Sequence, residues 1–166
     1  MEPTLEEQER LGPTVRRLRP SDMDDVVRLD AKLTGRRRER YFQTKLKMAL
    51  ADTGVEVSLA AENDGLFVGF LLARVYYGEF GSAEPTAVLD TLDVHPDFAG
   101  RGIGTALIDQ LRMQLAALGV DTLQTQVSWD DQRLLHFFHK QGFTLAPRLS
   151  LDLDLTQPSH AEEGEP

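Results

Sequence analysis

The chain has 166 residues and a net charge of −9, and 41% of its residues are hydrophobic. This length and composition predict one globular domain with its own core, while the negative charge argues against broad nucleic-acid binding. The absence of cysteine excludes disulfides and thiolate metal sites, and no apolar run is long enough to span a bilayer.

The first segment, residues 1–12, is rich in glutamate and is expected to be flexible. Its first ten residues lack the basic start and the apolar stretch of a signal peptide, so we expect a cytoplasmic protein without a membrane anchor. The folded domain is predicted to cover residues 13–155, beginning with a short strand at residues 14–19. An acidic tail, residues 156–166, is expected to be disordered because it has little to bury.

Two helices are predicted next. Ser21 is a good N-cap for a helix whose apolar stripe contains Val26, Val27 and Leu33. A second helix is predicted over residues 37–51, with apolar side chains at helical spacing.

The middle of the chain has the alternation typical of strands. Residues 55–61 and 66–77 are separated by Asn63-Asp64-Gly65, a strong hairpin signal, and residues 87–94 form a third strand. These three strands predict an antiparallel meander.

The second half changes to strands separated by helices. Leucines and isoleucine at steps of three and four predict a helix over residues 103–118 that ends at Gly119. The remaining predicted elements are a strand at 122–127, a helix at 130–141 and strands at 143–145 and 149–155. The last strand alternates Leu with Asp, as a half-solvated strand does.

The most informative segment lies between the third middle strand and the helix that follows. Gly100-Arg101-Gly102-Ile103-Gly104-Thr105 places three glycines directly before a helix. Glycines allow backbone N–H groups to approach an anion, and a helix start adds unpaired amides and a positive dipole end. This pattern predicts a diphosphate cradle, although a tight turn alone could also explain it. It is not a Walker loop, because no Gly-Lys-Ser/Thr follows.

Two longer motifs give the chain a resemblance to a known family. Residues 94–104, from Val94-His95-Pro96 to Gly102-Ile103-Gly104, resemble the strand–loop–helix signature of GNAT-type N-acetyltransferases, and residues 131–143 resemble its second signature, a helix ending in Gly-Phe. The resemblance implies a single α+β domain. Its mixed, mostly antiparallel sheet would have six or seven strands, splay in the middle and carry about four flanking helices.

The resemblance also implies a coenzyme site, with acetyl-CoA as co-substrate and no metal. The pyrophosphate would be bound by the backbone amides of six consecutive residues: Gly100, Arg101, Gly102, Ile103, Gly104 and Thr105. The pantetheine arm would run along the preceding strand, at Leu92, Asp93 and Val94, in the manner of an added strand.

Three positions depart from the family's pattern. Ala99 stands where Gln or Arg is usual, which removes a side-chain contact. Asp131 replaces a frequent Asn; it could bind pantetheine or simply cap its helix. Phe138 replaces the tyrosine that often protonates the departing thiolate, so this role passes to water or to Ser128, and Phe138 would pack against the pantetheine or in the core.

The expected reaction is direct attack by a neutral amine on the thioester, with a carboxylate accepting a proton. Asp90 is the preferred base, with Glu84 and Glu79 as alternatives. The acceptor would be a small-molecule amine or a protein lysine. The acidic run at residues 79–97 favours a cationic amine, whereas the basic run at residues 36–47 favours an acidic partner, and the sequence leaves both open.

Other functions are also left open. A GNAT-like domain that only binds acyl-CoA, as a sensor, is the main alternative, and a nucleotide-binding protein is a weaker one. Neither nucleic acid nor a membrane is expected as a partner, and a homodimer is one of the assemblies that the sequence allows.

Overall fold

The computed structural model describes residues 12–51, 57–78, 81 and 83–156. The segment predicted to be flexible and the acidic tail therefore lie almost entirely outside the described residues, as does Glu79. Among the described residues, none of the helices has the length and apolarity that a bilayer crossing requires.

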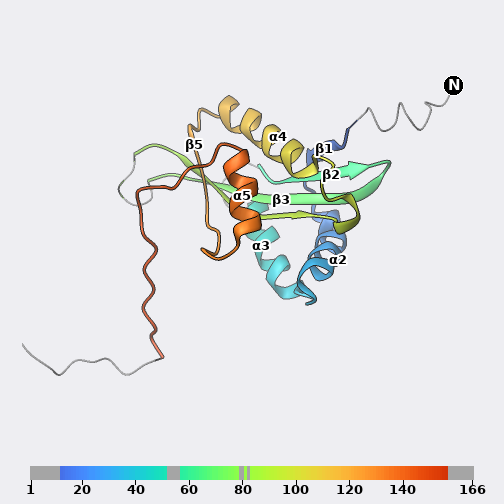
Figure 1. The fold of residues 1–166 in the computed structure, drawn as a ribbon, viewed down its shortest axis with the longest axis horizontal. Helices are drawn as coiled ribbons and strands as arrows, with labels where there is room; N and C mark the ends of the chain where they lie inside the picture. Colours follow the sequence, from blue (N-terminus) through green and yellow to red (C-terminus); the bar gives the residue numbers. More distant parts are fainter. Residues whose placement is uncertain (1–11, 52–56, 79–80, 82, 157–166) are drawn as a thin grey trace, which may run out of the picture.

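A mixed five-stranded sheet forms the centre of the molecule, in the order β1-β2-β3-β4-β5 (Figure 1). Its strands are β1 (Thr14–Arg17), β2 (Leu59–Asn63), β3 (Leu66–Tyr76), β4 (Thr86–Val94) and β5 (Thr122–Thr125). The first four strands pair antiparallel, and β5 joins β4 in parallel. The predicted meander is confirmed, and its first turn has positive φ at Asp64 and Gly65.

Four α-helices cover the sheet, as expected: α2 (Met23–Thr34), α3 (Glu39–Ala51), α4 (Ile103–Ala117) and α5 (Gln132–Lys140). Helices α2 and α3 lie on one face of the sheet and α4 on the other (Figure 1). Short 3-10 turns, η1 (Pro20–Asp22) and η3 (Pro96–Phe98), precede α2 and the glycine loop.

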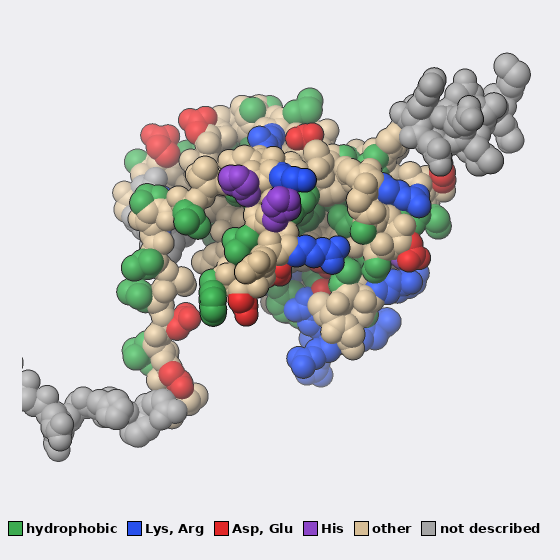
Figure 2. Space-filling model, in the orientation of Figure 1, with side chains coloured by type: hydrophobic (Ala, Val, Ile, Leu, Met, Phe, Trp, Pro, Cys, Tyr) green, Lys and Arg blue, Asp and Glu red, His purple; other side chains and the backbone are tan. Residues whose placement is uncertain are grey.

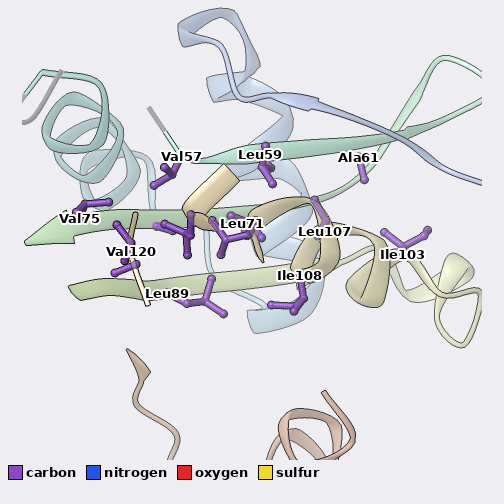
Figure 3. Close-up of a cluster of buried hydrophobic side chains, with 14 of the residues drawn as sticks. Val57, Leu59, Ala61, Leu71, Val75, Leu89, Ile103, Leu107, Ile108 and Val120 are labelled. Carbon is purple, nitrogen blue, oxygen red and sulfur yellow. The ribbon is translucent and has the colours of Figure 1, made fainter. Parts of the chain in front are cut away.

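The sheet separates two hydrophobic clusters. The larger one lies between α4 and the sheet, where Leu107 and Ile108 of α4 face Leu71 and Leu89 (Figure 3). The smaller one joins α2 and α3 to the opposite face through Val26, Phe42 and Phe70. Because β3 is buried on both faces, it provides the rigid centre from which β4 extends.

The predicted N-cap of the first helix was wrong, although the helical segment does begin at Pro20, as η1 followed by α2. Ser21 lies inside η1 and caps nothing, and it is Asp22, 5% exposed, that accepts a hydrogen bond from the Arg19 amide at 2.7 Å. Arg16 of β1 also donates two hydrogen bonds of 2.8 Å to this carboxylate. Arg16 of β1 therefore holds Asp22, which is the N-cap residue of α2 by position but makes no side-chain hydrogen bond to that helix.

The expected sheet of six or seven strands was also wrong, because the described residues form five. Residues 143–145 and 149–155 form no strand, and the chain leaves the body of the molecule after Phe143 (Figure 1). The leucines predicted to half-bury, from Leu149 to Leu155, are between 82% and 90% exposed. The alternation is present, but no strand lies beside it to complete the pairing.

Candidate active site

Strands β4 and β5, the last two in the order of the sheet, pair over only part of their length. Their parallel pairing runs only from Thr86 opposite Thr122 to Leu89 opposite Thr125, where the Thr125 hydroxyl donates a 2.9 Å hydrogen bond to the Leu89 carbonyl. Beyond this point no described residue pairs with β4 on the β5 side. The C-terminal half of β4 therefore offers an open backbone edge on the side where β5 has ended.

The backbone direction along this edge follows from one hydrogen bond. The amide of His95 donates to the carbonyl of Val68 at 2.8 Å, so it points towards β3. Backbone groups of successive residues in a strand point to alternate sides. The N–H and C=O groups of Leu92 and Val94 therefore point into the gap, and those of Asp93 point towards β3.

The glycine loop follows the open edge of β4 after the short η3 turn. Gly100 and Gly102 have φ of 76° and 77°, which side-chain-bearing residues adopt only with strain, and an added Cβ at either would meet nothing within 4 Å. The loop is thus shaped by backbone conformation and is open on its outer side.

The amides of this loop are unpaired. In the part of the chain that the structure describes, the first helical amide with a recorded acceptor is that of Ala106, which donates to Gly102 at 2.9 Å, and Ala99 donates to Pro96. None of the six amides from Gly100 to Thr105 donates to a described group. Orphan amides at a helix start form an anion-binding site.

Two side chains flank these amides. The Arg101 guanidinium lies 5.0 Å from the ring centroid of Phe98, which orients the charge beside the loop. The exposed Thr105 hydroxyl accepts a 2.9 Å hydrogen bond from Gln141 at the end of α5 and keeps its own proton to donate. A Cβ on Gly104 would lie 3.1 Å from the Phe137 ring, so any larger residue would require the ring of α5 to shift.

The residues predicted around α5 take mostly structural positions. Asp131 accepts a 3.0 Å hydrogen bond from the Leu134 amide and is therefore the helix N-cap. Phe138 is 5% exposed and packs edge-on against Phe137 and Phe143 in the core. Ser128 is exposed, and its hydroxyl donates at 2.6 Å to Asp130.

Two acidic side chains of β4 lie on the face of the sheet that α2 and α3 cover. Asp90 has no partner in the β3–β4 register, because Leu72 faces Thr91 and Ala73 faces Leu89. This bulge turns its carboxylate to the Lys45 ammonium of α3, at 2.8 Å, with the Asp90 side chain 22% exposed. The predicted base thus forms an ion pair with a helix 45 positions away in the sequence.

Asp93 lies on the same side, in a cluster with Asp30 and Arg38. Asp30 of α2 is buried and receives two hydrogen bonds from Arg38, at 2.5 and 2.9 Å. The Oδ2 atom of Asp93 is inaccessible and has no hydrogen-bond partner. Burial, followed by the charge of Asp30, raises the pKa of Asp93 to about 6, although Arg38 opposes the shift.

This cluster was not found from the sequence, which placed Asp93 among the residues along the pantetheine. Asp30 and Arg38 carry no motif and lie more than 50 positions before Asp93. Tyr41 lies between this cluster and the Lys45–Asp90 ion pair, because its ring centroid is 4.7 Å from the Arg38 guanidinium carbon and 5.6 Å from the Lys45 nitrogen.

Solved structures show which class of fold this is. The aminoglycoside N-acetyltransferase AAC(6')-Iy in complex with CoA is 18% identical, with a TM-score of 0.71 over 86% of this chain and 95% of that one. A ribosomal-protein-alanine N-acetyltransferase from Brucella melitensis biovar Abortus 2308 is 22% identical, with a TM-score of 0.68 over 87% and 99%. A transcriptional regulator from Bacillus halodurans C-125 is 20% identical, with a TM-score of 0.72 over 86% and 99%. The molecule has the α+β GNAT acetyltransferase fold.

The sequence itself identifies the family. A family model described as the Acetyltransferase (GNAT) family matches residues 23–143, which include α2, the glycine loop and α5. The chain therefore belongs to the GNAT acetyltransferase family, which confirms the resemblance found in its two motifs.

Proposed function

We propose that this protein transfers an acetyl group from acetyl-CoA to a primary amine. One observation carries the proposal: a row of amides without a described acceptor, from Gly100 to Thr105, lies close to the open backbone edge of β4, since a Cβ on Gly104 would be 3.8 Å from the Val94 side chain. This combination suits a ligand with a diphosphate at one end and a peptide-like arm at the other, and coenzyme A has both.

The coenzyme would lie along the gap between β4 and β5. Its pyrophosphate would accept hydrogen bonds from the loop amides, and Arg101 and Thr105 would add a charge and a hydroxyl donor. Its amide-containing arm would pair with the backbone groups of Leu92 and Val94 as a strand would. Because Phe138 is buried and Asp131 caps its helix, we assign neither a coenzyme contact.

The chemistry is a direct transfer. A neutral amine attacks the thioester carbonyl, the new N–C bond forms and the C–S bond breaks. The Val94 amide, which points into the gap, would polarise the carbonyl oxygen. The thiolate is a good leaving group and takes its proton from water or from the exposed Ser128 hydroxyl, so the protein supplies mainly orientation.

The amine must lose a proton, and two carboxylates of β4 could accept it. Asp90, the base expected from the sequence, is held in an ion pair by Lys45. Asp93 has a pKa of about 6, which lies closer to the value an efficient base needs at neutral pH, and its unpaired Oδ2 atom is buried until a substrate opens the site. We therefore favour Asp93 as the base and keep Asp90 as the second candidate.

The charges near β4 favour a cationic acceptor. Two arginines and one lysine of the basic run are already paired with acids: Arg37 with Glu39, Arg38 with Asp30, and Lys45 with Asp90. Asp93 adds a further acidic group, and the cation that acts on it, Arg38, is already hydrogen-bonded to Asp30. A primary ammonium, on a small molecule or on a protein lysine, fits this balance better than an acidic acceptor does.

The test combines ligand binding with turnover. Thermal melts with acetyl-CoA, longer acyl-CoAs, NAD and ATP would show a rise in melting temperature with acyl-CoA, because binding to the native state stabilises it. Release of the coenzyme A thiol would then be measured with a panel of amines and lysine peptides. Stabilisation without turnover for any amine would make the protein an acyl-CoA sensor, and stabilisation by NAD or ATP alone would refute coenzyme binding.

A further inference from the structure

Helices α2 and α3 carry a basic surface on an acidic protein. Residues 28–48 contain eight lysines and arginines against two acids, in a chain with a net charge of −9. Figure 2 shows Lys and Arg side chains gathered over these two helices. Four of the eight are exposed and form no ion pair with a described acid: Lys32, Arg36, Arg40 and Lys47. These four residues, called the basic face below, leave their charge open to a partner.

Apolar side chains lie among these charges. Leu33, Tyr41 and Met48 are 45%, 39% and 40% exposed. On α3, Tyr41 and Met48 are seven residues apart, so they lie on one side of the helix, two turns from each other. Aromatic and methionine side chains are enriched where proteins bind other proteins. Positive charges with apolar side chains between them therefore fit a polypeptide better than they fit a small ion.

The basic face lies next to the carboxylates of β4. Lys45 of α3 is 2.8 Å from Asp90, and Arg38 is close enough to Asp93 to oppose the rise in its pKa, so one side of α3 borders the proposed site. Arg40 lies on another side of the same helix. The two sides are about 10 Å apart, the diameter of a helix, and an extended chain covers this distance in about three residues.

The two sets of charges fit different parts of one acceptor. The carboxylates of β4 attract the ammonium group that reacts, whereas the basic face attracts acids about three residues away from it. A small polyamine supplies only the ammonium group. A nucleic acid supplies only the negative charges, and the net charge of −9 repels it. A lysine within an acidic stretch of polypeptide supplies both.

We propose that the acceptor is a protein lysine flanked by aspartate or glutamate residues, and that the basic face binds those acids. The inference rests on the proposed acetyl transfer and narrows its acceptor from primary amines in general to acidic polypeptides. Tyr41 and Met48 would pack against apolar parts of the same polypeptide. Because the basic face binds the acceptor away from the reacting atoms, its loss should raise KM much more than it lowers kcat.

The first test measures binding without turnover. The probes are fluorescent peptides with one central lysine and two glutamates about three residues away on each side, and matched peptides with glutamine instead of glutamate. In fluorescence anisotropy at low salt, with coenzyme A present, the glutamate peptide should bind about 20-fold more tightly than the glutamine peptide. This preference should largely disappear at about 0.5 M NaCl, because salt screens exposed charges.

The second test reverses charges on the basic face. In the variant Arg36→Glu/Arg40→Glu, the ratio of kcat/KM for the glutamate and glutamine peptides should fall from about 20 to about 1. The variant should instead prefer a peptide with arginine in place of glutamate. The control Arg17→Glu/Arg148→Glu makes the same change in net charge at two exposed positions, one on β1 at the opposite edge of the sheet from β5 and one beyond α5. It should keep the wild-type ratio, and melting temperatures would check that both variants fold.

Three outcomes would overturn the proposal. The two peptides could bind equally well at low salt, the folded Arg36→Glu/Arg40→Glu variant could keep the preference for glutamate, or duplex DNA could bind more tightly than the glutamate peptide.

The tests also separate this inference from the proposed acetyl transfer. Turnover of small amines but of no peptide would refute the protein acceptor and leave acetyl transfer in place. Binding of the glutamate peptide without turnover of any amine would refute acetyl transfer, and the acceptor with it, and would leave the basic face as a binding surface for acidic proteins.

Discussion

Replacing Asp93 by asparagine should make the protein more stable and much less active. The carboxylate lies beside the buried Asp30 carboxylate, and one of its oxygens lacks a hydrogen-bond partner. Asparagine has almost the same shape but no charge, and its amide can donate a hydrogen bond to Asp30. The substitution therefore removes the burial cost of a charge while removing the proposed base.

The size of the stability effect follows from the pKa. A rise from 3.8 to about 6 is about two pKa units, or about 3 kcal/mol of penalty on the ionised form. The native state binds the proton more tightly than the unfolded chain, so this penalty develops as the pH rises from about 4 to 6. The Asp93→Asn substitution should thus stabilise by about 1–3 kcal/mol at pH 7.5, or about 3–10 °C in melting temperature, and by far less at pH 4.

The activity effect has the opposite sign. The base must be ionised, so wild-type kcat/KM should fall as the pH drops through about 6 and reach about a tenth of its plateau at pH 5. Asp93→Asn should lower kcat about 10²- to 10⁴-fold and abolish this acidic limb, with little change in coenzyme affinity. Thiol release measured across pH, beside urea unfolding at pH 4 and 7.5, gives both quantities.

Asp90→Asn is the matched control, because it removes a carboxylate from the same strand. It should reduce turnover much less than Asp93→Asn does. If Asp90→Asn alone abolishes the acidic limb, Asp90 is the base. If Asp93→Asn is less stable than the wild type at pH 7.5, the account of a strained, ionised Asp93 is wrong.

Two further substitutions test the loop and the β1 network. Gly102→Ala, at φ 77°, should weaken coenzyme A binding about 5- to 10-fold in calorimetry, because alanine strains the loop conformation. The control Gly119→Ala, at φ 71° on the far end of α4, should not weaken it. Equal affinities of the two variants would show that the loop does not bind the coenzyme. Arg16→Ala should cost about 3 kcal/mol in urea unfolding at pH 7, because it leaves the buried Asp22 charge unpaired, while Arg28→Ala on the surface should cost under about 0.5 kcal/mol. The hydrogen bonds of Arg16 oppose burial and lower the pKa of Asp22, so the stabilisation should disappear only as the pH falls below 3.8, and a loss already complete near pH 6 would contradict it.

The parts of the site that could be predicted are those encoded over short distances. The glycine loop is one, because three glycines before an amphipathic helix determine the turn, the helix start and the unpaired amides together. The hairpin at Asn63-Asp64-Gly65 is another. In both cases the conformation depends on neighbouring residues, which a single sequence displays.

The parts that could not be predicted depend on residues far apart in the chain. The ion pair of Lys45 with Asp90 and the burial of Asp93 beside Asp30 arise only when α2 and α3 pack across β4. Their residue types are ordinary for a helix surface. The pKa of Asp93 is raised by desolvation, and desolvation has no signature in a local pattern.

The same distinction explains the C-terminal segment. Its Leu–Asp alternation indicates that one face of the segment favours burial, but the pattern does not indicate which strand edge would cover that face. The sequence by itself determined the family, the glycine loop and the order of the helices and the first five strands, because local backbone preferences and hydrophobic periodicity act within an element. Only the tertiary structure decided which carboxylate is buried and that residues 149–155 lie free of the sheet, because burial and strand pairing are properties of surfaces brought together by folding.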